Sequence, residues 1–161
     1  MRRLVAIAVI VSAVAAACGK PPSGESGVTM RTPEALRSAP AQLTAGAATL
    51  SLEVEAWRSF QPTMDSVENR LIAILRVKAT GGGVPGALAV DTLWLVHGSD
   101  VVQGFAREEE PRAPGATTVD FILRDGPMWA PGDSIDVIAS LSGVGAGAAL
   151  LRAPRVAIAR V

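Results

Sequence analysis

The chain has 161 residues, with 15 Lys and Arg against 15 Asp and Glu, so its formal net charge at pH 7 is zero. Proteins that bind nucleic acids carry a basic face, and we therefore expect no nucleic-acid partner. The chain has one His, one Cys and no Tyr. These counts exclude an internal disulfide and leave few side chains for soft-metal binding or nucleophilic catalysis.

The first 18 residues have the pattern of a bacterial lipoprotein signal. Met1 to Arg3 is positively charged, Leu4 to Val14 is apolar, and three alanines precede Cys18. This pattern predicts a signal peptide over residues 1–17. It also predicts that Cys18 is lipidated, with fatty acids such as palmitate, and anchors the mature protein to a membrane. The sequence departs from the usual lipoprotein pattern at Ala15, where Leu is common.

Two other interpretations of this segment are weaker. A transmembrane helix over residues 4–17 would be about 21 Å long, short of the ~30 Å hydrocarbon core of a bilayer. Ordinary secretion would leave Cys18 as a lone thiol in an oxidising compartment. Gly19, rather than Asp, follows the cysteine. We therefore expect a location in the cell envelope, on the periplasmic face of the outer membrane.

Residues 18–47 are predicted to be the lipidated cysteine and a flexible linker. The stretch from Gly19 to Gly46 is rich in Pro, Ser, Gly and Ala and contains few large apolar residues. Thr32 followed by Pro33 would suit the start of a short helical turn. The alternative is that Leu36 and Leu43 dock on the domain as a short helix or an extra edge strand.

From residue 48 onward, apolar and polar residues alternate, which is typical of strands with one buried face. The expected strands are 48–56, 70–79, 88–96, 101–105, 117–124, 135–141 and 150–161. Pro154 interrupts the last of them, which indicates an edge strand or a bulge. Ten residues are expected to share one core: Leu52, Val54, Leu71, Leu75, Trp94, Phe121, Leu123, Ile135, Val137 and Leu141.

About seven short strands with Gly- and Pro-containing turns predict an all-β domain over residues 48–161. The segment from Asp125 to Val137 contains a Pro-Gly turn, and a Gly-rich hairpin follows it. This segment resembles the corner between strands E and F of immunoglobulin-like domains. The whole of residues 49–161 is similar to uncharacterised bacterial lipoproteins of this kind. The resemblance implies an immunoglobulin-like two-sheet antiparallel β-sandwich and carries no activity with it.

Three motifs that suggest chemistry have simpler interpretations. Gly81 to Gly86 matches a dinucleotide-binding pattern, but a strand rather than a helix follows it, so a loop between strands is expected. Glu108 to Glu110 offers carboxylates for Ca²⁺, yet three adjacent residues of an extended chain cannot all face one ion. His97 lies beside a hairpin turn without a second ligand for a soft metal. We expect no cofactor, no metal site and no catalytic residue.

The tryptophans are the remaining candidates for a binding surface. Trp94 is expected in the core, and Trp129 at one end of the sandwich. Trp57, with Arg58 and Phe60, is the candidate partner contact, because Trp and Arg are enriched in interface hot spots. The sequence therefore predicts a non-catalytic, lipid-anchored envelope module that binds or supports another envelope component. The alternative is a periplasmic ligand carrier or a domain resembling a protease inhibitor.

Overall fold

A computed structural model describes residues 31–61 and 69–161. The predicted signal peptide, Cys18 and the first part of the expected linker lie outside the described residues. In chain order, the described elements are α1 (Pro33–Arg37), β1 (Gln42–Ala45), β2 (Ala48–Arg58), β3 (Leu71–Thr80), β4 (Ala89–His97), β5 (Asp100–Gly104), β6 (Thr118–Gly126), β7 (Ser134–Ser142) and β8 (Ala149–Arg160).

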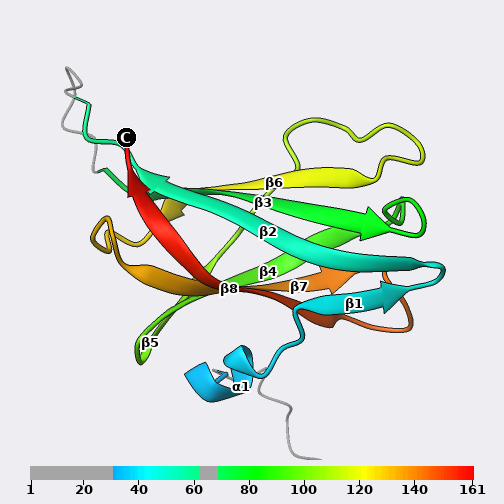
Figure 1. The fold of residues 1–161 in the computed structure, drawn as a ribbon, viewed down its shortest axis with the longest axis horizontal. Coiled ribbons are helices and arrows are strands. Elements are labelled where there is room, and N and C mark those ends of the chain that lie inside the picture. Colours follow the sequence, from blue (N-terminus) through cyan, green and yellow to red (C-terminus); the bar gives the residue numbers. More distant parts are fainter. Residues whose placement is uncertain (1–30, 62–68) are drawn as a thin grey trace, which may run out of the picture. The chain divides into compact units, whose positions relative to one another are not determined.

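The strands form a curled sheet in the order β5-β4-β7-β8-β2-β3-β6, with β1 beside β2. Neighbouring strands are antiparallel except β2 and β8, which run parallel where Ala56 faces Ile158 and Arg58 faces Arg160. This short parallel contact joins two antiparallel halves into a half-barrel (Figure 1). The all-β expectation is confirmed, whereas the expected separation into two antiparallel sheets is not, because β8 pairs with both halves.

The main core lies between the two halves of the half-barrel. Alternate residues of β3 are buried, from Leu71 to Val77, and their neighbours from Ile72 to Lys78 are only partly buried. Burial of the apolar face of each strand is the main favourable contribution to such a fold. Eight of the ten expected core residues belong to this cluster, and Val54 packs against it partly buried. The alternation in the sequence therefore predicted the inward face of the strands correctly.

Trp94 is the exception among the expected core residues. It is half-buried on the outer face of β4, where it packs against a second apolar cluster, while its neighbours Leu93 and Leu95 face the main core. The segment from Leu93 to Val96 is apolar on both faces, so alternation could not assign the inner face. The smaller aliphatic side chains fill the interior, and Trp94 covers the outside.

The second cluster extends the folded body beyond the expected boundary at residue 48. Leu36 of α1 is fully buried against Val96 and Ile138 on the outer face of β4 and β7. Thr32 caps α1, since its hydroxyl accepts a hydrogen bond from the Ala35 N–H at 3.2 Å. Strand β1 then pairs with β2. The expected linker is therefore corrected: residues 31–47 form a short helix and an extra strand, as the docking alternative proposed.

Pro154 marks a bulge inside β8 rather than an edge strand. The pairing with β7 shifts between Ile135 and Val137, so that Asp136 alone lies opposite two residues of β8, Pro154 and Arg155. Arg155, in the bulge, has a φ of 52°, which lies in the left-handed region that non-glycine residues rarely adopt. Its N–H donates to Asp136 Oδ1 at 3.4 Å. The bulge lies just before the point where β8 changes its partner, because pairing with β7 ends at Ala157 and pairing with β2 begins at Ile158.

Candidate functional site

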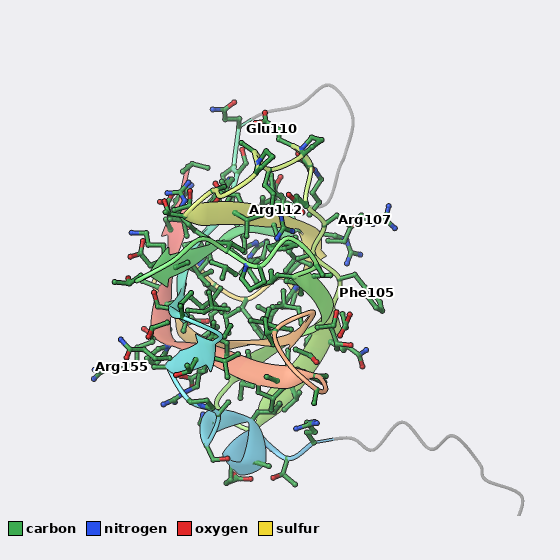
Figure 2. All side chains as sticks on the ribbon, turned by 90° about the vertical axis from the view of Figure 1, so that its right-hand side faces the viewer. Phe105, Arg107, Glu110, Arg112 and Arg155 are labelled. Carbon is green, nitrogen blue, oxygen red and sulfur yellow. The ribbon has the colours of Figure 1, made fainter. Side chains whose placement is uncertain are left out.

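The segment that follows β5 crosses to the free edge of β6. Arg107 and Ile122 form an isolated antiparallel bridge. The Arg107 N–H donates to the Ile122 carbonyl at 3.1 Å, and the Ile122 N–H donates to the Arg107 carbonyl at 2.8 Å. Phe105, just before the bridge, is 68% exposed. Figure 2 shows Phe105, Arg107, Glu110 and Arg112 on the half of the molecule that contains β6.

Arg112 fixes this segment to the body. Its guanidinium donates to Glu108 Oε1 at 2.9 Å and to the carbonyl oxygens of Pro85 and Leu88 at 3.2 and 2.7 Å. A further bond joins it to Glu108 Oε2. The guanidinium also lies 5.8 Å from the centre of the Phe121 ring, within the range of a cation–π contact. One half-buried cation therefore holds the 107–112 segment, the loop before β4 and the core aromatic together.

A groove of about 670 Å³ opens between the 109–112 segment and the outer face of β3 and β6. Its lining residues are Arg76, Lys78, Glu109, Glu110, Pro111, Arg112, Thr118, Val119, Asp120 and Ile122. A second hollow of about 520 Å³ lies on the other side of the Arg107 bridge and includes Phe105 and Arg124. We call the first hollow the β6 groove.

Most charges of the β6 groove are already paired. Arg76 forms two hydrogen bonds with Asp120, at 2.9 and 2.7 Å, and this interaction raises the pKa of Arg76 above its usual value. Glu109 forms two bonds with Arg124, at 2.8 and 2.7 Å. Among the described residues, Glu110 has no such partner and lies exposed at the rim (Figure 2). The groove is thus polar and held in place by ion pairs, with one free carboxylate.

The floor of the β6 groove includes backbone groups without a strand partner. Both backbone groups of Ile122 bond to Arg107, so they point away from β3. The backbone N–H and C=O groups of successive residues in a strand point to opposite sides of it in the plane of the sheet. Those of Thr118 and Asp120 therefore point away from β3, as those of Ile122 do. No other described strand pairs with them on that side. This part of β6 is an open sheet edge, which is a template for pairing with another extended chain.

Acid is expected to weaken the 107–112 segment through Glu108. The hydrogen bond from Arg112 lowers the pKa of Glu108 below its ordinary 4.5. The ionised carboxylate therefore stabilises the fold fully above pH 4.5, and the contribution is lost as the pH falls through the lowered pKa. Urea unfolding of the wild type and Glu108→Gln, from pH 7 to about pH 3, tests this. The difference in the free energy of unfolding should shrink with falling pH, and a constant difference would contradict the assignment.

The candidate partner contact predicted from the sequence lies where β2 ends. Phe60 contacts two guanidinium groups, those of Arg58 at 5.1 Å and Arg160 at 4.7 Å from the ring centre. Arg58 also donates to the carbonyl oxygens of Asn69, Met128 and Trp129. Its guanidinium therefore joins the end of β2 to the residues just before β3 and to the loop between β6 and β7.

Trp57 is half-buried and lies on the opposite side of β2 from its two predicted companions. It pairs with Ile72 of β3 and with Ala159 of β8. Successive side chains of a strand point to opposite faces. The structure thus brings Arg58 and Phe60 together but does not add Trp57 to them.

The structure also shows where the glycine motif, the glutamate run and His97 lie. Residues 81–86 form the loop between β3 and β4, as expected. Glu108 and Glu109 bind different arginines rather than one ion. His97 lies 3.5 Å from Asp133 and 5.2 Å from the centre of the Trp129 ring system. Within residues 31–61 and 69–161, no group of three or more potential metal ligands occurs.

Sequence reasoning did not single out Arg112 or the β6 groove. A signal was present: Glu108 and Arg112 have the i, i+4 spacing of a local ion pair. However, the pairing becomes important only because Arg112 also reaches Pro85 and Leu88, which lie more than twenty residues away. No sequence pattern indicates that contact.

Comparisons with known proteins found no matching family model, no similar curated protein and no similar solved structure. In the described part of the chain, no helix has the length and apolar character needed to cross a bilayer.

Proposed function

We propose that this protein is a non-catalytic, lipid-anchored module of the cell envelope that binds an extended segment of another envelope protein. The anchor is the predicted lipid at Cys18, and the proposed location is the periplasmic face of the outer membrane. The observation that carries the binding proposal is the open edge of β6 at Thr118 and Asp120, which borders a groove of about 670 Å³. Partners that add a strand to such an edge gain main-chain hydrogen bonds.

The groove favours a peptide over a small apolar ligand. Small-molecule pockets are mostly apolar and enclose their ligand. The β6 groove, in contrast, is lined by charged side chains, such as those of Arg76 and Asp120. The ion pairs fix these side chains before a partner arrives, which lowers the entropy cost of binding. The polar lining therefore supports the partner-binding function over the ligand-carrier alternative.

The strand order also supports a relation to immunoglobulin-like domains. One half contains β2, β3 and β6, the other contains β5, β4, β7 and β8, and β8 runs parallel to β2. In immunoglobulin-like sandwiches, two antiparallel sheets of three or four strands enclose one core. We propose that the half-barrel is a variant of that sandwich in which the bulged last strand joins both halves.

Site-specific photo-crosslinking in cells that express the protein tests the binding function. A photoreactive residue at Thr118 should give a discrete higher-mass adduct, because a partner strand would lie within reach of this edge. The same residue at the exposed Asp100 on β5 serves as the control and should give none. A third experiment places the photoreactive residue at Glu110, on the rim of the β6 groove, so that Thr118 can be substituted. Thr118→Pro removes the outward N–H without affecting pairing to β3, and it should abolish the adduct formed from Glu110. Equal adducts at Thr118 and Asp100, or none at Thr118, would overturn the proposal.

A further inference from the structure

Four arginines gather on the outer face of β4, β7 and β8 around α1. We call this the α1 arginine surface, and its members are Arg31, Arg37, Arg152 and Arg155. Trp94, Ile138 and Arg152 form one cross-strand row on that face. The Arg31 guanidinium lies 5.4 Å from the centre of the Trp94 ring system, which places it over the same row.

The other two arginines lie beside the bulge of β8. Arg37 donates to Asp136 at 2.9 Å and to the Gly98 carbonyl at 2.6 Å. The Arg155 backbone N–H donates to the other oxygen of the same carboxylate at 3.4 Å. The side chain of Arg155 extends outward from the ribbon (Figure 2). Arg31 and Arg37 therefore lie at the two ends of α1, and Arg152 and Arg155 lie on the neighbouring strand β8 around Asp136.

This surface carries an excess of positive charge. Its carboxylates are Glu34 of α1 and Asp136, with Asp100 at the tip of the neighbouring hairpin. Asp136 is shared by Arg37 and Arg152, at 2.9 and 3.7 Å, so two cations surround one anion. Arg31 and Arg155 are exposed, and their guanidinium groups have no carboxylate partner among the described residues. An anionic surface could therefore meet both of them directly.

The chain enters the described body at this same surface. Arg31 is its first residue, and 13 peptide steps separate it from Cys18, so the two Cα atoms can be at most about 47 Å apart. The anchor at Cys18 is therefore tethered to the α1 end of the body and not to the opposite side. In both views, β6 lies on that opposite side (Figures 1 and 2).

We propose that the α1 arginine surface docks on anionic lipid headgroups and holds the β6 groove away from the membrane. This inference rests on the lipid anchor of the proposed function and adds an orientation to it. Basic residues near a membrane are attracted by its negative surface potential, within about a Debye length. Trp94, half-buried beside Arg31, adds the kind of aromatic residue that is enriched at membrane interfaces.

Vesicle sedimentation tests the docking without the anchor. The chain from residue 18 with Cys18→Ser retains the whole described body and is mixed with vesicles of phosphatidylcholine, with or without about one third phosphatidylglycerol. We expect binding only to the anionic vesicles, with loss at high salt. Arg31→Glu with Arg155→Glu should weaken binding at least about tenfold, because each basic residue near an anionic surface contributes roughly fivefold.

Arg107→Glu with Arg160→Glu is the matched control, since it changes the net charge equally away from α1. The control variant should bind as the parent does, and circular dichroism of all variants should show the same fold. Equal binding to neutral and anionic vesicles, or equal losses in both double variants, would overturn the docking surface. Neither result affects crosslinking at Thr118, so failure here is distinguishable from failure of the proposed partner binding.

Discussion

Leu36→Ala is expected to lower the free energy of unfolding by about 2–5 kcal/mol, the usual cost of removing a fully buried leucine side chain. Leu36 has no exposed surface and packs against Val96 and Ile138, so the substitution leaves a cavity under α1. Such a loss is a large fraction of the stability of an ordinary domain. Urea unfolding followed by circular dichroism measures it.

Glu34→Ala is the control for this experiment. It lies on the exposed side of the same helix, and surface substitutions of this kind change stability by about 0.5 kcal/mol or less. If Leu36→Ala were equally mild, α1 would contribute nothing to the body, and the folded part would begin at residue 48 as the sequence suggested. A large difference between the two variants supports a body that begins near residue 31.

The error over residues 31–47 has a clear physical origin. The conformational entropy lost on ordering nearly thirty residues would exceed the free energy gained by burying Leu36 and Leu43. However, only part of the stretch is ordered in the described body, and α1 gains the cap from Thr32 and the bond from Arg37 to Asp136 as well. The partner surface for Leu36 comes from β4 and β7, and sequence composition gives no information about it.

The strands were predictable because one face of each is apolar. Alternation placed the seven strands from β2 to β8 within about two residues of their observed ends. It failed where both faces are apolar, as from Leu93 to Val96, and where the strand is short, as in β1. Alternation also did not predict the bulge at Arg155, because a bulge is defined by the pairing of β8 with its neighbour β7.

The candidate site was less predictable than the fold. Glu108 and Arg112 are visible in the sequence as charged residues of a loop, and a solvent-exposed loop is the ordinary expectation for them. The structure instead places Arg112 half-buried, where it donates to two carbonyl oxygens of the loop before β4. Contacts between loops that are distant in sequence decide the site, while local patterns decide the strands.

Arg112→Ala is expected to lower the free energy of unfolding by about 2–3 kcal/mol, because it leaves the ionised Glu108 and two carbonyl oxygens without their donor. Arg124→Ala is a matched control that removes the same geometry, a guanidinium bonded twice to the neighbouring glutamate Glu109. The Arg124 side chain is 60% exposed and that of Arg112 only 13%, and exposed pairs contribute at most about 1 kcal/mol.

Urea unfolding at pH 7 gives both values, and hydrogen exchange of the Arg107 and Ile122 amides adds a local readout. Arg112→Ala should accelerate exchange at this bridge, because the 107–112 segment loses its attachment to Pro85 and Leu88. Arg124→Ala should change it little. Equal and small effects of the two substitutions would show that the segment beside β6 is held by its backbone bridge alone. The groove would then depend on the two hydrogen bonds of the Arg107–Ile122 bridge rather than on the Arg112 guanidinium.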